Sequence, residues 1–171
     1  INIKDFKGKI SFENVTFAYE ENINVLKNVS FSVKAGETIA LVGPTGAGKS
    51  TVVNLVSRFY DIQSGRILID GIDIKTVTLD SLRTQMGVMT QDNYIFSGTI
   101  RENIAYGNLN ATEEEIIEAS KAVHAHDFIC KLENGYDTKL TARGGELSNG
   151  QRQLVAFART MLSKPAILIL D

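Results

Sequence analysis

The segment GPTGAGKS (43–50) is the part of the sequence whose residue types and spacing point most directly to chemistry. Gly43, Gly46 and Gly48 let the backbone turn its N–H groups inward along a path that side chains would obstruct. Lys49 adds a full positive charge, and a helix starting there adds about half an elementary charge more. Such a group of donors binds phosphate oxygens, and the spacing GxxxxGK[ST] is that of the phosphate-binding loop of nucleotide-binding proteins.

The elements on either side of this loop have the order that the motif requires. The apolar run TIALVG (38–43) predicts a strand, and KSTVVNLVSRFY (49–60) repeats apolar residues at helical spacing. A chance glycine-rich turn would not come with this flanking pattern. The sequence therefore predicts a site for ATP and Mg²⁺, whose contacts from this segment are Gly43, Pro44, Thr45, Gly46, Ala47, Gly48, Lys49, Ser50 and Thr51.

Three of these side chains have separate predicted roles. Lys49 faces the β and γ phosphates, and Ser50 ligates Mg²⁺. Thr51 donates to the α phosphate, although threonine is also an ordinary choice in the first turn of a helix. The run AILILD (166–171) predicts a buried parallel strand that delivers Asp171 beside the loop, where it holds Mg²⁺ through coordinated water.

A second helix start lies in LSNGQRQ (147–153). From Leu154 onward, apolar residues recur at i, i+3, i+4, i+7 and i+8, which indicates an amphipathic helix with Ser148 as its N-cap. A serine in this place can act as a cap alone, a role that contributes about 1 kcal/mol. Taken by itself, the segment favours that structural role.

Four features of the sequence occur in a fixed order: GPTGAGKS, Gln91, LSNGQRQ and ILILD. In this order and combination the sequence resembles the ATP-binding-cassette (ABC) family. The signature of that family is LSGGQ followed by a helix. The resemblance covers essentially the whole chain. It implies an α/β fold: a P-loop NTPase core with a parallel sheet, an N-terminal antiparallel β subdomain and a helical subdomain insert. The alternating pattern of KISFENVTFAY (9–19), with a possible bulge near Asn14, and the turn signal Asp70-Gly71 agree with a β-rich start.

The resemblance also gives the second helix start a function. Two domains of this family pair head to tail, and the signature helix of one completes the ATP site of the other. Ser148 and the amides near Gly150 are therefore implied to meet the γ phosphate held on the partner copy's phosphate loop. Asn149 replaces a glycine of the family's signature and adds bulk there. The implied contacts from this segment are Ser148, Asn149, Gly150 and Gln151.

Two further positions are carried over from the family. Gln91 stands where the family has a glutamine that touches Mg²⁺ or the attacking water; as an isolated residue it would be interpreted as a polar linker. Tyr19 stands where the family has an aromatic ring that stacks on adenine, a contact that contributes about 1–3 kcal/mol in base-binding proteins. Phe17 shares its strand face, so either ring could be used. The implied metal ligands are Ser50, Gln91 and Asp171, and the implied catalytic residues are Lys49, Gln91 and Ser148.

The segments TARGGE (141–146) and QDNYIFSGTIRENIAYG (91–107) resemble the exporter type of the family, in which transmembrane domains are fused in the same polypeptide. Exporters carry a GERG-like segment where TARGGE stands, with Ala142 in place of its glutamate. The side chains at 94–96 either line a groove for a coupling helix of the transmembrane domains or pack internally. The resemblance implies an ATP-driven exporter domain on the cytoplasmic face of the membrane, with its transmembrane domains upstream of Ile1.

Composition limits the other classes of protein. The chain has 171 residues, 43% of them hydrophobic, and a formal net charge of −2. No broad basic surface is expected, so nucleic acid is a disfavoured partner. No run approaches the ~20 apolar residues of a membrane-spanning helix, so the domain itself is expected to be soluble and not inserted in the membrane. We expect one domain over 1–171, with a β and P-loop core (1–92), a helical subdomain (93–162) and a return to the core (163–171).

Within the helical part, Thr112 and Glu115 form a capping box that predicts one helix continuing to about Leu132. His124 and His126 would point in different directions on that helix and make poor joint metal ligands.

The last expectation concerns residues that the family places beyond Asp171. There the family has a glutamate that polarises water and, further on, a histidine that contacts the γ phosphate. The sequence stops at Asp171, which predicts a truncated domain that turns ATP over slowly. Two alternatives to an exporter ATPase stay open: a soluble cassette of DNA repair, chromosome organisation or translation, and a regulatory cassette that binds ATP without hydrolysing it.

Overall fold

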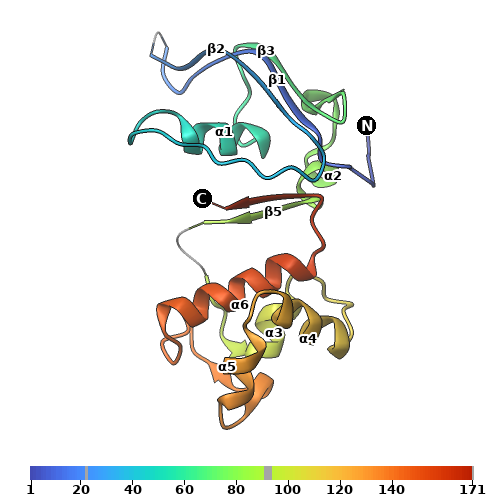
Figure 1. The fold of residues 1–171 in the computed structure, drawn as a ribbon, viewed down its shortest axis with the longest axis vertical. Coiled ribbons are helices and arrows are strands. Elements are labelled where there is room, and N and C mark those ends of the chain that lie inside the picture. The colour runs from blue at the N-terminus through green and yellow to red at the C-terminus, as the bar shows by residue number, and fades with distance from the viewer. Residues whose placement is uncertain (22, 91–93, 171) are drawn as a thin grey trace. The chain divides into compact units, whose positions relative to one another are not determined.

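The computed structural model describes residues 1–21, 23–90 and 94–170 and is drawn in Figure 1. The chain forms two compact units, Ile1–Met86 and Gly87–Asp171, which are described separately. The predicted division at residues 92 and 162 stays a prediction. Among the described residues, no helix combines the length and the apolar character needed to cross a bilayer.

The first unit is built on a sheet with the strand order β2-β1-β3-β4, in which each adjacent pair is antiparallel. Register shifts on both sides of β1 surround Asn14, whose φ of 51° marks a bulge. The antiparallel β start, the bulge near Asn14 and the turn at Asp70-Gly71 are therefore confirmed. The strands are β1 (Ile10–Ala18), β2 (Asn24–Val33), β3 (Ser64–Ile69) and β4 (Ile72–Asp73).

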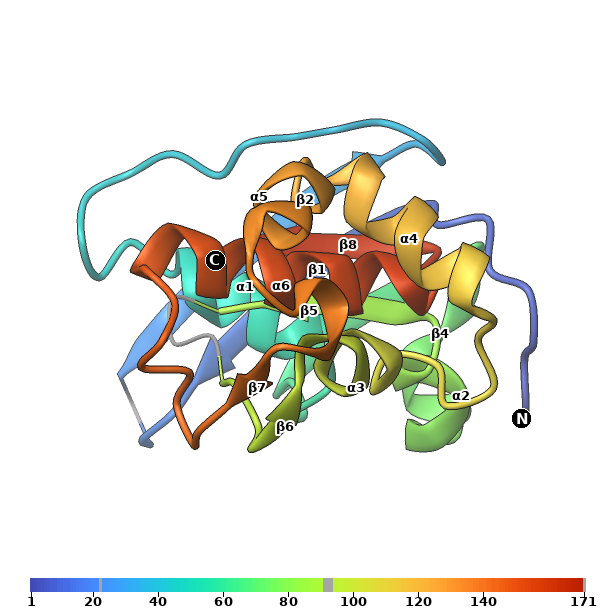
Figure 2. The same ribbon diagram turned by 90° about the horizontal axis from the view of Figure 1, so that it is seen from below.

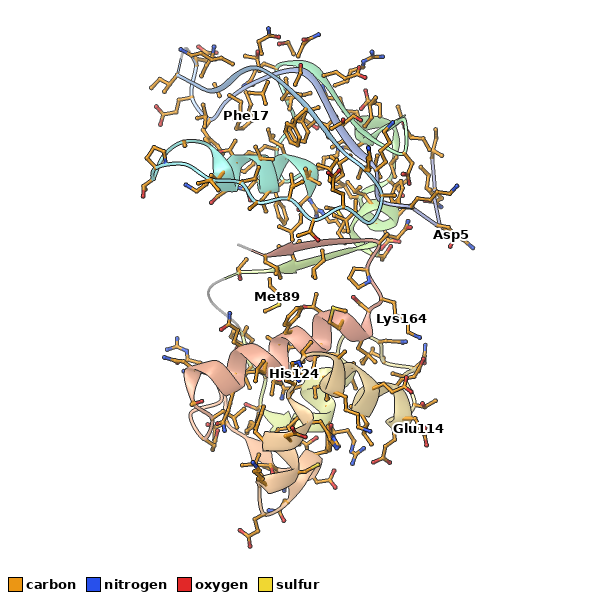
Figure 3. All side chains as sticks on the ribbon, viewed as in Figure 1. Asp5, Phe17, Met89, Glu114, His124 and Lys164 are labelled. Atoms are coloured by element: carbon orange, nitrogen blue, oxygen red, sulfur yellow. The ribbon has the colours of Figure 1, made fainter. Side chains whose placement is uncertain are left out.

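Three short helices accompany this sheet: α1 (Lys49–Val56), the 3-10 helix η1 (Ile74–Thr76) and α2 (Leu79–Arg83). Figure 3 shows Phe17 of β1 on the face of the sheet that α1 covers. Phe17 and Leu55 of α1 are both buried, so sheet and helix remove apolar surface from water together. This packing fixes α1, and with it the phosphate loop, against the sheet.

The strand predicted for TIALVG (38–43) is not formed. These residues have no strand geometry, and Val42 is 91% exposed. A strand requires that its N–H and C=O groups pair with a neighbouring strand, and no strand of the described residues pairs with this segment. The apolar run indicates a preference for burial, but it does not supply the partner strand, which has to come from elsewhere in the sequence.

The second unit contains most of the helices and a two-stranded antiparallel ladder. Figure 2 shows α3 and α4 beside the long helix α6. Fully buried Ile100, Ile104, Val155 and Ala158 lie in the core between these helices. The elements are β6 (Gly98–Thr99), α3 (Ile100–Ala105), α4 (Glu113–Ala122), α5 (His126–Lys131), the 3-10 helix η2 (Gly135–Asp137), β7 (Lys139–Leu140) and α6 (Asn149–Leu162).

The single helix predicted after Thr112 is two helices. The capping box of Thr112 and Glu115 is confirmed, but α4 ends at Ala122 and α5 begins at His126. His124 lies between them with φ of 60°, in the left-handed region that commonly ends a helix. The Ala125 N–H then donates to the Ser120 carbonyl at 2.8 Å, a bond that closes the helix end. Apolar spacing continues through this break, so it did not reveal the change in direction.

A second sheet pairs β5 (Met86–Met89) with β8 (Ile167–Leu170), and both strands run in the same direction in Figure 1. The strand predicted within AILILD is therefore present. Its predicted burial is only partly correct, because Ile167 is buried whereas Leu170 is 62% exposed. Within the described residues, β5 is the one strand that hydrogen-bonds to β8, so the other edge of β8 has no neighbouring strand there.

Candidate functional site

The phosphate loop ends in two glycines whose backbone is left-handed, Gly46 with φ of 84° and Gly48 with φ of 88°. Gly48 is the N-cap of α1 and has no side chain to occupy the helix start. A Cβ on Gly48 would lie 2.9 Å from Leu26 Cδ2 of β2, so a methyl group there would force the end of the Leu26 side chain to shift. A Cβ on Gly46 would meet nothing within 4 Å, which leaves that side of the loop open.

Lys49 folds back over the loop. Its Nζ donates to the Gly43 carbonyl at 2.7 Å and to the Pro44 carbonyl at 2.9 Å. In the described part of the chain, no hydrogen bond takes up the backbone N–H groups of Gly46, Gly48 or Lys49. An exposed loop with unpaired N–H groups, an ammonium group and a helix N-terminus has the donor set that a triphosphate requires.

Tyr19 stands beside the first turn of α1. Its hydroxyl donates to Thr51 Oγ1 at 3.2 Å, and Asn54 Nδ2 donates to the same hydroxyl at 3.3 Å. The rings of Phe17 and Tyr60 meet the Tyr19 ring nearly at right angles, at centroid distances of 4.8 and 5.0 Å. Tyr19 is 47% exposed and Phe17 only 2%, so of the two rings on this strand face only Tyr19 offers surface to a ligand.

The start of α6 has the capping geometry that the sequence predicted. Ser148 Oγ accepts from the Gln151 N–H at 3.2 Å, and Gln151 Oε1 accepts from the Ser148 N–H at 3.0 Å. Ser148 is thus the N-cap of a complete capping box, and the prediction of this cap is confirmed. Ser148, Asn149 and Gly150 are all exposed. A Cβ on Gly150 would meet nothing within 4 Å, so the helix end is open to an incoming group.

Arg152 holds the segment before this helix, a role that the sequence analysis missed. Its Nη1 donates to the carbonyls of Leu147 at 2.7 Å and Gly144 at 3.2 Å, and its Nη2 contacts Asn149 Oδ1. The Asn149 side chain therefore braces Arg152 where the family's glycine could not. The i, i+3 spacing of Asn149 and Arg152 on a helix was a usable signal for this pair.

The side chains at 94–96 are not all packed internally, and the groove for a coupling helix stays a prediction. Ile95 is fully buried, whereas Tyr94 is 57% exposed and packs edge-on against Phe96 at 4.9 Å. Arg159 of α6 lies over the Phe96 ring at 5.0 Å and donates to the Tyr94 carbonyl at 2.9 Å. Arg159 also donates to the backbone and side-chain oxygens of buried Asn103, at 2.8 and 3.0 Å.

This arginine has an electrostatic cost that its partners offset. Burial lowers the pKa of Arg159 because the charged guanidinium loses water. Three oxygen acceptors and the Phe96 ring replace that water. Asn103 and Arg159 are 56 residues apart, and nothing in the sequence pattern could have paired them.

Two expected metal ligands, Gln91 and Asp171, lie outside the described residues. The third, Ser50, lies in the first turn of α1, directly after Lys49. Its hydroxyl fits a hard cation such as Mg²⁺, which takes oxygen ligands and usually keeps several waters. Within the described residues there is no group of three or more His, Cys, Asp or Glu side chains that could hold a metal ion.

The family model described as ABC transporter matches residues 26–171. Over its whole length, the chain is 54% identical to the ABC transporter ATP-binding protein YknV of Bacillus subtilis (strain 168). The match covers 28% of that protein. Over 99% of its length, the chain is 48% identical to a fatty acid ABC transporter ATP-binding/permease protein of Mycobacterium bovis. The match covers 27% of that protein.

A solved structure of a bacterial Atm1-family ABC exporter with ATP bound is 46% identical and superposes with a TM-score of 0.92. The match covers 99% of this chain and 29% of that one. The chain thus spans less than a third of the length of each of these three proteins.

Proposed function

We propose that this chain, which belongs to the ABC transporter family, binds ATP with Mg²⁺ and hydrolyses it at a site that a second copy completes. The observation that carries the proposal is the loop 43–50, with its left-handed glycines and with Lys49 at the N-terminus of α1. The N–H groups of Gly46, Gly48 and Lys49 have no hydrogen-bond acceptor among the described residues. Helix-end donors of this kind favour a phosphate group.

Nucleotide binding would use side chains of the first unit. Lys49 would exchange its two carbonyl acceptors for β and γ phosphate oxygens. This exchange is favourable because phosphate oxygens carry negative charge, so the ammonium group gains a charge–charge attraction that a neutral carbonyl oxygen does not supply. The exposed face of Tyr19 would stack on adenine, and Thr51 would donate to the α phosphate.

Mg²⁺ would neutralise charge on the phosphates when it is bound. We propose Ser50, Gln91 and Asp171 as its ligands or as ligands of its water. Gln91 would in addition place the attacking water, as the resemblance to the family implies.

The helix start at Ser148 would serve the partner copy. A hydroxyl accepts and donates at once, so Ser148 Oγ can cap the Gln151 N–H and still give its own proton to a γ phosphate. The N-terminus of α6 adds a favourable dipole, with Asn149, Gly150 and Gln151 in its first turn. Loss of the γ phosphate on hydrolysis removes this contact, so ATP would favour the paired state more than ADP does.

We further propose that the site drives export across a membrane, with this domain on the cytoplasmic face. The chain's likeness to an ATP-binding/permease protein and to an exporter supports this reading over a cassette of DNA repair or translation. Transmembrane domains of the same polypeptide would be its second partner. The exposed Tyr94 and half-buried Phe96, held by Arg159, would contribute to the surface that meets them.

The experiment that tests the nucleotide site is the change Lys49→Ala. Because a hydrogen bond to a charged group contributes about 1.5–3 kcal/mol, the Kd for ATP should rise about 10- to 100-fold. Isothermal titration with ATP in the presence of Mg²⁺ measures this change. An unchanged Kd in a variant with a normal melting temperature would mean that the loop does not bind the triphosphate.

A further inference from the structure

The hydroxyl of Tyr19 is the middle member of a chain of hydrogen bonds. Asn54 Nδ2 donates to it at 3.3 Å, and it donates to Thr51 Oγ1 at 3.2 Å. Both outer residues belong to α1, the helix that begins at the phosphate loop, whereas Tyr19 directly follows β1. The chain of bonds therefore joins the exposed ring to the loop's own helix.

The direction of these bonds follows from the chemistry of the groups. An amide nitrogen is donor only, so the Tyr19 oxygen accepts from Asn54, and the Tyr19 hydroxyl in turn donates to Thr51 Oγ1. Thr51 is 5% exposed, and within the described residues no acceptor takes its hydroxyl proton. Thr51 thus keeps one donor unused, with its oxygen already oriented by Tyr19.

The rings around Tyr19 restrict it on other sides. Phe17 and Tyr60 stand at interplanar angles of 86° and 88° to it. These edge contacts limit the tilt of the ring, and the two hydrogen bonds fix its outer end. Since a rigid ring loses less freedom on binding, this arrangement prepares the ring for stacking.

We propose that Asn54 is a positioning residue, which through the Tyr19 hydroxyl aligns the adenine-stacking ring with the α-phosphate donor Thr51. The base and the first phosphate are then recognised as one unit. The inference rests on the proposed function, in which Tyr19 and Thr51 bind ATP. It adds Asn54 and a stated direction of hydrogen bonding.

The test compares two probes, ATP and inorganic tripolyphosphate, which lacks the base. Tyr19→Phe removes one oxygen atom and keeps the ring. Losing one hydrogen bond typically costs a factor of about five in binding, so the Kd for ATP should rise about fivefold for Asn54→Ala. Tyr19→Phe removes both hydrogen bonds of the hydroxyl, so its Kd should rise at least as much. The Kd for tripolyphosphate should change by less than about twofold, because no base is positioned.

A double variant and a matched control complete the design. Tyr19→Phe with Asn54→Ala should bind ATP no more weakly than Tyr19→Phe alone, because Tyr19→Phe already removes the hydrogen bond from Asn54. Tyr60→Phe removes a hydroxyl from the neighbouring ring, for which the structure shows no hydrogen bond among the described residues, and should leave both Kd values unchanged. Melting temperatures establish that the compared variants are equally folded.

Three outcomes overturn the inference: ATP binding unchanged in both single variants, equal losses for ATP and tripolyphosphate, or losses that add in the double variant. Equal losses would mean that Asn54 supports the loop as a whole. Failure of the proposed function is a separate result, because then Lys49→Ala would leave the binding of both probes intact.

Discussion

At the scale of single residues, the phosphate loop depends on backbone that only glycine adopts without strain. Gly46 and Gly48 share a positive φ, but only Gly48 also lies against another element, at Leu26 of β2. Alanine substitutions at the two glycines therefore separate the cost of a left-handed backbone from the cost of steric overlap. Conformational strain acts at both positions, and steric overlap acts at one.

We expect Gly46→Ala to cost about 1–2 kcal/mol of folding free energy, the usual penalty for a left-handed alanine. Gly48→Ala should cost more, because its Cβ would also press on Leu26 Cδ2 at 2.9 Å. Urea denaturation of both variants measures the difference. Equal losses of stability would contradict the assigned contact between the helix start and β2.

Asn149 provides a second test at this scale. Asn149→Gly restores the family's signature residue but removes the side-chain acceptor of Arg152. We expect faster amide exchange over 144–147, because Arg152 also holds the Leu147 and Gly144 carbonyls. Gly150→Ala, where a Cβ meets nothing within 4 Å, is the matched control. Unchanged amide exchange in Asn149→Gly would show that Arg152 keeps its position without the Asn149 side chain.

At the scale of elements, the packing of α3 on α6 depends on Gly107. A Cβ there would overlap the carbonyl oxygen of Arg159, in the middle of the contact that also holds Asn103. We expect Gly107→Ala to lose about 2–4 kcal/mol of stability, since backbone has to move. Gly145→Ala, which has open space, should change stability by less than about 1 kcal/mol. A melting temperature unaffected by Gly107→Ala would contradict this packing.

The start of α4 should respond to pH. A hydrogen bond from Lys164, together with the Thr112 N–H, lowers the pKa of the Glu115 carboxyl. A carboxyl whose pKa is lower in the folded state contributes stability above its unfolded pKa and loses it as the pH falls through the folded value. The melting temperature should therefore fall less in Glu115→Gln than in the unchanged chain over this acidic range. Identical pH profiles would count against the ion pair.

Elements with local causes could be predicted from the sequence. The capping box at Thr112, the N-cap at Ser148 and the phosphate loop all depend on neighbours within a few residues. The prediction of a strand in TIALVG (38–43) was wrong because a strand must pair with a second strand from another part of the sequence. Candidate site residues that depend on distant contacts were missed for the same reason, with Asn54 reaching a tyrosine 35 residues away.

At the scale of the whole molecule, the loop 43–50 and the Ser148 helix start each present donors suited to phosphate. The proposed function assigns them to one ATP held between two copies, the loop from one copy and the helix start from the other. That arrangement predicts complementation between two different defects. No arrangement in which a single copy supplies both parts of its own site gives the same result.

The most direct measurement mixes Lys49→Ala and Ser148→Glu chains and follows ATP-dependent association by analytical ultracentrifugation. Each variant alone should fail to pair, since every site would contain one defective half. The mixed pair contains one site with the intact Lys49 of one chain and the intact Ser148 of the other, so ATP should pair the mixture. A mixture that pairs no better than its separate components, while the unchanged chain does pair, would contradict the shared site.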